Sequence, residues 1–525
     1  MMINKDAKNI LIRGVNWIGD SIMTLPTIKS LRKIFKNSNI SLLIKPWVFS
    51  IFENNPDINE IIKYEDEYNT LLGHIKLANI LKKRKFDIAI LLQNAFDAAL
   101  ITFLAGIKER AGYKRDGRGF LLTKPINIHE KLKNKHQVYY YLNLIEGLGF
   151  KPEFSIPYIY LKIDERINAR NYLSHLKRPT LGINPGATYG SAKRWFPERF
   201  AEIASWFIKD TDGSVIIFGS KSETDISEEI IKHIETKYLK DYVPIIDNKH
   251  SKVLDLTGRT TLRELVSLIS ECDVFLTNDS GPLHISYAVG TPLVALFGST
   301  NPELTGPLGN SNIVIKSDTP CSPCFNRSCK QNDLMCMHTI TSDEVYYGIK
   351  KLLYENRAVF FDRDGTLCKD NNYINNFDKL EIFPEINQLS ILKEHGFKII
   401  GISNQSGISR GLVDENFVKE VNKIFIKKYN FDAFYYCPHH PDEHCSCRKP
   451  ELGMLIKAKG EFNINIKKSY IIGDKETDML LAKASGAKGI LVKTGEAKTS
   501  IYADFIAEGL KEAIGYIIKE SINGA

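Results

Sequence analysis

The chain alternates between short β-branched runs and amphipathic helical patterns along almost all of its 525 residues. An apolar run ends at a turn, a helical pattern follows, and another apolar run then begins. The apolar runs include NILIRGV, SLLIK, DIAILL, TLGINPG, SVIIFGS, DVFLTND and PLVALFG. Such alternation is typical of parallel sheets wrapped by helices, because parallel neighbouring strands need a crossover that is usually helical. The sequence therefore predicts an α/β fold.

The alternation is interrupted twice, and each interruption predicts a domain boundary. The first falls near 151–178, before the restart at TLGINPG. The second follows a helix expected at about 342–354, after which a new strand begins at VFFDRDGT. A chain of this length also exceeds what one hydrophobic core normally supports. We therefore predict three domains, at 1–165, 166–355 and 356–525.

Composition narrows the class of protein and its partners. The chain is 43% hydrophobic and 25% charged, which is ordinary for a globular protein, and its formal net charge is +8. Positive charge favours acidic partners such as nucleotides, phosphosugars or an anionic membrane surface. No basic stripe interleaved with aromatic residues argues for nucleic acid, so we expect no nucleic-acid partner.

Neither a targeting signal nor a membrane span is expected. The amino terminus has no apolar segment followed by a small-residue cleavage site. The most apolar long window, 86–107, is interrupted by Asp87, Gln93, Asn94 and Asp97. We therefore expect a cytoplasmic protein.

The nine cysteines fall mainly in two clusters. The first, CSPCFNRSCKQNDLMC, has the spacing C-x2-C-x4-C-x6-C and contains Cys321, Cys324, Cys329 and Cys336. The second, CPHHPDEHCSC, contains three cysteines and three histidines. In a reducing compartment, clustered thiols suit metal binding better than a disulfide framework. For the first cluster two interpretations stay open, reduced structural cysteines or a structural metal site.

Acidic and polar side chains follow three strand-like runs in the last third of the chain. The runs are VFFDRDGT, GISNQSG and YIIGDKETD, and a lysine comes from CRKP. The carboxyl ends of parallel strands meet at one edge of a sheet, where this set of side chains suits phosphoryl transfer. Like charges ~4 Å apart repel by roughly 4 kcal/mol at an effective dielectric near 20. Mg²⁺, which prefers oxygen ligands, is therefore the expected neutralising ion.

This motif set resembles the haloacid-dehalogenase-like (HAD-like) phosphatase superfamily, whose four motifs are all present in order. The resemblance implies Asp362 as a nucleophile that forms an aspartyl-phosphate, and Asp364 as general acid and then base. It also implies that Ser403, Asn404 and Lys449 hold the phosphoryl oxygens.

The same resemblance implies the ligands of the magnesium ion. They are the side chains of Asp362 and Asp474 and the main chain of Asp364. Asp478 is expected to support the lysine or a metal-bound water.

Within this superfamily, DRDGTL, SNQSGISRG and CPHHPDEHCSCRKP are similar to the D-glycero-D-manno-heptose 1,7-bisphosphate phosphatases. The resemblance covers 357–520. The nearest alternative is the histidinol-phosphatase branch, which carries a similar Cys/His loop. QSGISRG after the second strand and ELGM after RKP favour the heptose branch.

The Cys/His loop is expected to be a structural clamp. Three thiolates and one imidazole complete a tetrahedral zinc site and leave no open position for a catalytic water. The resemblance favours as zinc ligands Cys437, His439, Cys445 and Cys447. His440 and His444 are the alternatives. Zinc would then fix the loop that delivers Lys449 to the phosphate and Arg448 to the substrate.

Three strand-to-helix turns in the first two thirds carry charged or small residues. ILIRGVNWIGD places Asp20 at the first helical turn, where a helix-capping role is the alternative. NPGATYGSAKRWFP carries Lys193 in a turn that lets backbone and cation approach a phosphate. FLTNDSGPLH joins a strand tip to a helix start, with Asp279, Ser280, Gly281 and His284.

Together these turns resemble the ADP-heptose:lipopolysaccharide heptosyltransferases over about 8–350, in the style of the heptosyltransferase II branch. The resemblance implies a GT-B architecture of two Rossmann-like domains, with the nucleotide sugar on the second and the acceptor on the first. It implies Asp20 as the general base and Lys193 as the cation that meets the departing diphosphate. Glu223 would hold the ribose or adenine. The diphosphate and donor sugar would be cradled by Asp279, Ser280, Gly281 and His284.

Both resemblances point to heptose in lipopolysaccharide synthesis. We predict a bifunctional enzyme that transfers heptose from ADP-heptose to a heptose of the lipid A–Kdo core and hydrolyses the 7-phosphate of heptose 1,7-bisphosphate. LLQNAFDA departs from the transferase pattern where acceptor contacts are expected, so the core sugar stays open. A lipid acceptor and a basic chain favour peripheral attachment to the inner face of the inner membrane. The alternatives are heptosyltransferase I activity, a silent core-binding platform, and a histidinol-phosphatase.

Overall fold

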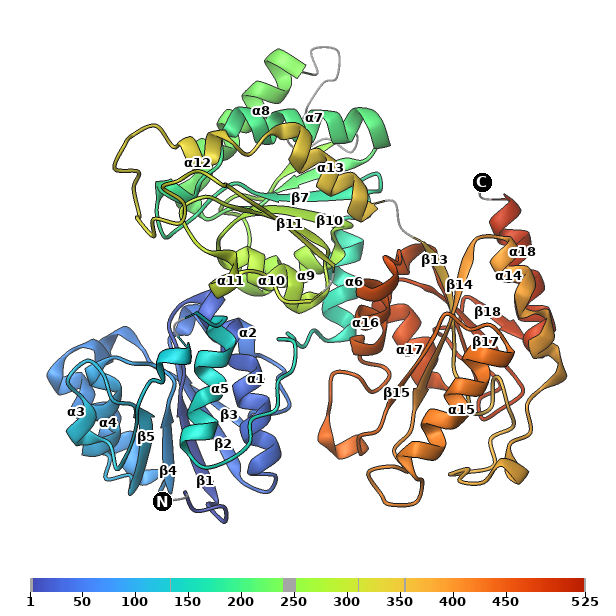
Figure 1. Cartoon of the computed structure of the whole chain (residues 1–525), viewed down its shortest axis with the longest axis horizontal. Helices are drawn as coiled ribbons and strands as arrows, with labels where there is room; N and C mark the ends of the chain where they lie inside the picture. Colours follow the sequence, from blue (N-terminus) through green and yellow to red (C-terminus); the bar gives the residue numbers. More distant parts are fainter. Residues whose placement is uncertain (1–2, 133, 239–251, 310, 354–355, 524–525) are drawn as a thin grey trace. The chain divides into compact units, whose positions relative to one another are not determined.

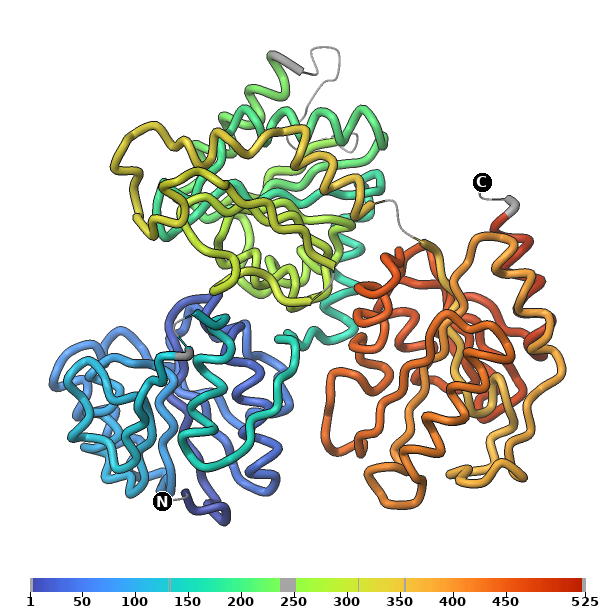
Figure 2. The backbone as a smooth tube through the Cα atoms, in the orientation of Figure 1, coloured from blue at the N-terminus to red at the C-terminus, as the bar shows by residue number. Residues whose placement is uncertain are grey.

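The computed structural model describes residues 3–132, 134–238, 252–309, 311–353 and 356–523 (Figure 1). Its strands form three six-stranded sheets. All pairs of neighbouring strands are parallel. The chain completes each sheet before it begins the next (Figure 2). The predicted α/β class is confirmed.

The first sheet has the strand order β3-β2-β1-β4-β5-β6. Its strands are β1 (Asn9–Arg13), β2 (Asn39–Ile44), β3 (Glu60–Lys63), β4 (Ile88–Leu91), β5 (Glu109–Tyr113) and β6 (Lys124–Ile126). The α-helices around it are α1 (Ile18–Ile34), α2 (Phe49–Phe52), α3 (Leu71–Lys83), α4 (Phe96–Leu104) and α5 (Gln137–Gly147).

The second sheet has the strand order β12-β11-β10-β7-β8-β9. Its strands are β7 (Thr180–Asn184), β8 (Ser214–Ile217), β9 (Val253–Asp255), β10 (Val274–Asn278), β11 (Leu293–Phe297) and β12 (Asn312–Lys316). α6 (Ile163–Tyr172) precedes β7 in the chain. The other α-helices of this part are α7 (Pro197–Thr211), α8 (Thr224–His233), α9 (Leu262–Glu271), α10 (Gly281–Val289), α11 (Pro302–Thr305), α12 (Met335–His338) and α13 (Ser342–Leu353).

The third sheet has the strand order β15-β14-β13-β16-β17-β18. Its strands are β13 (Arg357–Phe361), β14 (Phe397–Asn404), β15 (Ala433–Cys437), β16 (Tyr470–Gly473), β17 (Lys488–Val492) and β18 (Phe505–Ala507). Its α-helices are α14 (Ser390–Glu394), α15 (Glu415–Lys428), α16 (Gly453–Phe462), α17 (Glu476–Ser485) and α18 (Leu510–Asn523).

All three sheets share one strand order. With the strands of each sheet numbered from its own first strand, the order is 3-2-1-4-5-6 in every case. In such doubly wound sheets the winding direction reverses between the first and fourth strands, and ligands bind at the carboxyl ends beside that reversal point. The reversal points lie between β1 and β4, between β7 and β10, and between β13 and β16.

Successive residues of the central strands pack on opposite faces of their sheets. Ile10 and Ile12 belong to one apolar core and Leu11 to another. Phe361 and Phe360 are divided between two cores in the same way. Because neighbouring side chains of a strand point to opposite faces, both faces of these sheets are covered. None of the helices in the described part of the chain is both long and apolar enough to cross a membrane.

The chain divides into two compact units. One contains Met1–Leu161 and Ala169–Lys350, and the other contains Lys162–Asn168 and Lys351–Ala525. The first two sheets therefore form one unit, in which α1 packs on α10 and both sheets contribute to one apolar core. We refer to the parts built on these sheets as lobe 1 and lobe 2. The domain limits 1–165, 166–355 and 356–525 stay a prediction.

Candidate active sites

The reversal point of the third sheet gathers three carboxylates around one lysine. Asp362 follows β13, Asp474 follows β16, and Asp478 lies in the first turn of α17. One oxygen of each carboxylate lies within 4.8 Å of the others. Lys449 Nζ lies 2.6 Å from Oδ1 of Asp362 and 2.6 Å from Oδ1 of Asp478. Lys449 therefore joins the predicted nucleophile to Asp478, one of whose expected roles was to support this lysine.

The electrostatics of this cluster favour a cation. Burial and the charge of Asp362 raise the pKa of Asp474 to about 7. Burial also raises the pKa of Asp478 to about 6, against the charge of Lys449. Burial would lower the pKa of Lys449, but the two carboxylates outweigh it and raise that pKa. An all-oxygen donor set with excess negative charge fits Mg²⁺.

Two glycines leave room for the Asp474 carboxylate. A Cβ on Gly365 would lie 2.4 Å from Asp474 Oδ2, and a Cβ on Gly495 would lie 2.0 Å from the same atom. Gly365 also has a φ of +90°, which residues with a side chain rarely adopt. The main-chain N–H of Glu496 donates to Asp474 Oδ2 at 2.9 Å. The surrounding main chain therefore fixes this carboxylate at the sheet edge.

The side chain of Asp364 is held by Arg363. Arg363 Nε donates to Asp364 Oδ1, and Arg363 Nη2 donates to Asp364 Oδ2, both at 3.0 Å. Gln405 Nε2 donates to the same Oδ2 at 2.7 Å. Burial would raise the pKa of Asp364, but the charge and hydrogen bonds of Arg363 outweigh it and lower that pKa. The carboxylate is thus held in the form that a general base needs, and proton donation requires release from Arg363.

The other predicted phosphate contacts have different surroundings. Asn404 Oδ1 accepts from the Lys449 main-chain N–H at 3.0 Å, and Asn404 Nδ2 donates to the Lys449 carbonyl at 3.2 Å. The Asn404 side chain thus positions the lysine. Ser403 Oγ is buried and accepts from Gln405 Nε2 at 2.7 Å. Arg448 has a buried Nη1 with no hydrogen-bond partner among the described residues, which leaves an unsatisfied donor beside Lys449.

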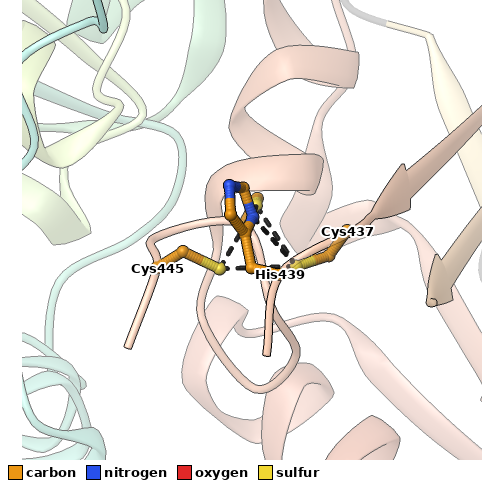
Figure 3. Close-up of side chains that lie close together, drawn as sticks. Cys437, His439 and Cys445 are labelled. Atoms are coloured by element: carbon orange, nitrogen blue, oxygen red, sulfur yellow. Dashed lines mark hydrogen bonds between the residues drawn. The ribbon is translucent and has the colours of Figure 1, made fainter. Parts of the chain in front are cut away.

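The four predicted zinc ligands meet at the end of β15. The Sγ atoms of Cys437, Cys445 and Cys447 lie 3.3–3.4 Å apart. His439 Nδ1 lies 3.5 Å from Cys437 Sγ (Figure 3). It lies 3.2 Å from Cys447 Sγ. Zn–S bonds of about 2.3 Å in a tetrahedron would place sulfurs ~3.8 Å apart, close to these separations. The donor set therefore fits a closed structural zinc site.

The two alternative histidines of this loop lie outside the four-residue group. His440 Nδ1 accepts from the Asp442 main-chain N–H at 3.3 Å and so caps the short helix that follows. His444 is exposed, with a left-handed backbone conformation. The loop continues from Cys447 directly into Arg448 and Lys449.

Asp20 lies in the first turn of α1, at the reversal point of the first sheet. Tyr141 of α5 donates its hydroxyl to Asp20 Oδ1 at 3.0 Å. Burial raises the pKa of Asp20, and the hydrogen bond from Tyr141 opposes that shift. A raised pKa makes a carboxylate a stronger base. Trp17 occupies the helix-capping position, so the capping alternative for Asp20 is wrong.

The amino-terminal ends of α1 and α10 meet. A Cβ on Gly19 would lie 2.7 Å from His284 Cδ2, and a Cβ on Gly281 would lie 3.3 Å from Ile18 Cβ. Small residues at both positions allow this approach. It brings Asp20 from lobe 1 close to the start of α10 in lobe 2, where main-chain N–H groups and the helix dipole favour an anion.

Lys193 and Asp279 form a buried ion pair beside the start of α10. Thr300 Oγ1 donates to the same Asp279 oxygen at 2.6 Å. Ser280 Oγ accepts from Asn184 Nδ2 at 3.2 Å, which links the strand ends of β7 and β10. These contacts fix the side chains of Lys193, Asp279 and Ser280, which are predicted to bind the diphosphate or the donor sugar.

Two buried histidines lie in this region of the first unit. His284 Nδ1 lies 3.3 Å from the Tyr287 hydroxyl, and burial lowers the pKa of His284 to about 4, so its imidazole is neutral near pH 7. His136 Nδ1 accepts from the Val138 main-chain N–H at 3.2 Å. The other nitrogen of His136 therefore donates to the Gly306 carbonyl, at 2.9 Å. This hydrogen bond joins lobe 1 to lobe 2.

Glu223 has a local structural contact. Its Oε2 accepts from the main-chain N–H of Ser220 at 2.7 Å and from the Ser220 hydroxyl at 2.8 Å, which caps a short helix. A Cβ on Gly186 would lie 1.8 Å from Glu223 Oε1, so the carboxylate packs against the loop after β7. The same loop continues to Lys193. The role of Glu223 in holding ribose or adenine stays a prediction.

The cysteine-rich segment, residues 321–336, contains four free thiols. In the described part of the chain, the groups of metal-binding atoms that lie within 4.8 Å of one another do not include these thiols. Cys321 and Cys324 are exposed, whereas Cys336 is buried. The arrangement favours the interpretation of reduced structural cysteines.

Sequence reasoning missed several residues that contact the predicted catalytic groups. Arg363 lies between the two acids of DRDG, and a cation between two acids at the end of a buried strand was a signal that could have identified it. Gln405 follows Ser403 and Asn404 in SNQSG, so it had a similar signal. Tyr141 lies in α5, an aromatic helix whose pattern indicates only core packing. His136, which caps that helix and bonds to the Gly306 carbonyl, was missed as well.

The first two sheets form a GT-B-like glycosyltransferase, and the third sheet forms a HAD-like phosphatase domain. A family model described as glycosyltransferase family 9 (heptosyltransferase) matches 74–335, and a HAD-hydrolase-like model matches 446–513. The solved structure of Escherichia coli ADP-heptose lipopolysaccharide heptosyltransferase II is 28% identical with a TM-score of 0.56, and the match covers 66% of this chain and 98% of that one.

Curated relatives indicate the specific family of each part of the chain. Lipooligosaccharide heptosyltransferase 2 of Campylobacter jejuni subsp. jejuni serotype O:6 is 31% identical over 65% of this chain and 98% of its own length. D-glycero-β-D-manno-heptose-1,7-bisphosphate 7-phosphatase of Yersinia pestis is 38% identical over 30% of this chain and 92% of its own length. The chain therefore belongs to the glycosyltransferase family 9 heptosyltransferases through its first two sheets, and to the heptose 1,7-bisphosphate 7-phosphatases through its third.

Proposed function

We propose that this chain catalyses two reactions of lipopolysaccharide inner-core synthesis. Lobes 1 and 2 transfer heptose from ADP-heptose to a heptose of the lipid A–Kdo core, as heptosyltransferase II. The third sheet hydrolyses the 7-phosphate of D-glycero-D-manno-heptose 1,7-bisphosphate. The observation that carries this proposal is that one chain matches almost the full length of both kinds of relative.

In the transfer reaction, Asp20 removes the proton of the acceptor hydroxyl, which attacks the anomeric carbon of the donor heptose. Its raised pKa and its position at the meeting point of α1 and α10 support this role. Lys193 and the start of α10 receive the negative charge that develops on the departing ADP. His284, being neutral, serves as a hydrogen-bonding group to the donor.

In the phosphatase reaction, Asp362 attacks phosphorus and forms an aspartyl-phosphate, and Asp364 protonates the sugar oxygen that leaves. Asp364 then takes a proton from the water that hydrolyses the aspartyl-phosphate. Lys449 holds a phosphoryl oxygen, with Asn404 and Asp478 fixing its position. Mg²⁺ held by Asp362, Asp474 and the main chain of Asp364 would neutralise the charge that the phosphate brings.

Zinc held by Cys437, His439, Cys445 and Cys447 would fix the loop that leads into Arg448 and Lys449. The unsatisfied Arg448 donor supports a contact with the sugar phosphate. The lipid acceptor and the net charge of +8 support a peripheral position on the cytoplasmic face of the inner membrane, and the free cysteines fit a reducing compartment.

The test uses the purified full-length chain in two assays. Phosphate release is compared for heptose 1,7-bisphosphate and histidinol phosphate, and a clear preference for histidinol phosphate would overturn the phosphatase assignment. Transfer is measured with ADP-heptose and two lipid acceptors, one ending in Kdo and one already carrying the first heptose. We expect transfer to the second. Transfer only to the first would make the enzyme a heptosyltransferase I, and no transfer to either would leave a core-binding platform.

A further inference from the structure

The cysteine-rich segment has no part in either proposed reaction, yet its main chain packs against the loop that carries Lys193. The N–H of Ala192 donates to the Arg327 carbonyl at 3.1 Å. A Cβ on Gly190 would lie 2.1 Å from the same carbonyl oxygen, so glycine at this position permits the contact. The two segments therefore touch at the residues next to Lys193.

A tyrosine of the Lys193 loop is shared by two cations. Lys193 Nζ lies 4.6 Å from the centroid of the Tyr189 ring, and Arg327 Cζ lies 5.1 Å from that centroid. The Tyr189 hydroxyl donates to the Phe325 carbonyl at 3.4 Å, which ties the ring to the cysteine-rich segment. The guanidinium of Arg327 and the amine of Lys193 thus contact the same ring, although the two residues are more than a hundred positions apart in the chain.

The charges around Lys193 leave a need for another cation. Lys193 is already paired with Asp279, and both side chains are at least 88% buried, with exposed fractions of 12% and 5%. His284 is neutral near pH 7. A departing nucleoside diphosphate carries several negative charges, which one lysine in an existing ion pair cannot balance. Arg327 is exposed and has no carboxylate partner in the described part of the chain.

We propose that Arg327 is a second cationic contact for the diphosphate of the nucleotide sugar, an inference that rests on the proposed transferase function. The guanidinium offers paired donors that match two phosphate oxygens, whereas Lys193 acts as a point charge. The cysteine-rich segment is then the element that brings this arginine to the donor site. It belongs to substrate binding although its cysteines take no part in the chemistry.

The test compares full-length Arg327→Gln with Lys330→Gln, which removes an exposed cation from the same segment. ADP binding is measured by titration calorimetry and transfer by the KM for ADP-heptose. Arg327→Gln is expected to weaken ADP binding by about tenfold, the effect of losing one charge-assisted hydrogen bond, and to raise KM similarly. Lys330→Gln is expected to stay within about twofold of wild type. Arg327→Lys should restore part of the loss.

A second variant checks the contact between the segments. Gly190→Ala adds a methyl group that would collide with the Arg327 carbonyl, so it should move Arg327 away from the Lys193 loop and weaken ADP binding to a similar degree, although the arginine side chain itself is unchanged. Arg327→Gln protein that binds ADP like wild type would overturn the inference and leave the proposed function intact. Wild-type protein that neither binds ADP nor transfers heptose would overturn the proposed function together with this inference.

Discussion

The second and third sheets have the same strand order, but they place opposite charge patterns at their reversal points. In lobe 2, Lys193 offsets Asp279, His284 is neutral, and the start of α10 adds a positive helix end. In the third sheet, Asp362, Asp474 and Asp478 meet one buried lysine. The topology determines where a ligand binds. The charges determine the chemistry that each site suits, which is stabilisation of an anionic leaving group in lobe 2 and phosphoryl transfer at the third sheet.

The two sites also differ in how they are completed. The proposed transferase base comes from lobe 1 and the proposed diphosphate residues from lobe 2, so the proposed site needs both lobes. The phosphatase groups all come from one sheet and from the Cys/His loop beside it. Each site therefore depends on its own compact unit, and each can be disabled by itself.

The largest expected effect is on the phosphatase. Asp362→Asn removes the proposed nucleophile, so phosphate release from heptose 1,7-bisphosphate should fall on the order of 10³-fold or more. Heptosyl transfer by the same protein is the internal control and should match wild type. Phosphatase activity within tenfold of wild type would show that Asp362 is not the nucleophile and that the third sheet does not attack phosphorus through this carboxylate.

The second largest expected effect is on the transferase. Asp20→Ala removes the proposed general base, so transfer from ADP-heptose to a heptose-bearing acceptor should fall by about 10²–10⁴-fold. Phosphate release from heptose 1,7-bisphosphate should stay unchanged, because Asp20 lies in the other compact unit. Unchanged transfer would contradict the base assignment.

A smaller effect is expected from the Cys/His loop. Cys445→Ser removes one proposed zinc ligand, so the bound zinc measured by emission spectroscopy should be lost and phosphatase kcat should fall on the order of tenfold, because Lys449 is less firmly placed. His444→Gln is the matched control in the same loop and should keep both zinc and activity. Zinc retained by Cys445→Ser and lost from His444→Gln would reassign the ligand set.

The smallest expected effect is a pH dependence of stability that Mg²⁺ reverses. The folded-state pKa of Asp474 is about 7, above its ordinary value of 3.8. Because the raised pKa means that the folded state binds the Asp474 proton more tightly, protonated Asp474 stabilises the fold. In the absence of Mg²⁺ this contribution to stability is complete below about pH 4 and is lost as pH rises through 7. Added Mg²⁺ should raise the Tm of the third-sheet unit at pH 8 by about 2–4 °C and less at pH 5.

The matched variant for this measurement is Asp474→Asn, which keeps the shape of the side chain but cannot ionise. Its Tm should fall less than that of wild type between pH 5 and pH 8, the remaining change coming from Asp478, whose pKa is raised to about 6. Added Mg²⁺ should shift its Tm less than it shifts that of wild type. An equal Mg²⁺ shift in both proteins would place the ion elsewhere.

Sequence patterns predicted the features that depend on local order along the chain. Strand runs followed by polar tips placed Asp362, Asp474 and Asp279 at the sheet edges where the structure has them. The patterns could not reveal that Asn404 bonds to the main chain of Lys449, because that contact depends on where the Cys/His loop returns to β14. Tyr141 and His136 could not be recognised either, because their partners lie on distant segments that only folding brings together.

Gly365 and Gly495, the two glycines around Asp474, affect how the activity of related sequences should be inferred. A descendant that kept every acid and the lysine but replaced Gly365 or Gly495 would have a methyl group within 2.4 Å of the Asp474 oxygen. Its motifs would still score as those of a phosphatase, although the carboxylate would be displaced. Such a chain would keep the phosphatase motifs but lose the activity. The residues at positions 365 and 495, and not the retained acids, would then distinguish it from an active relative.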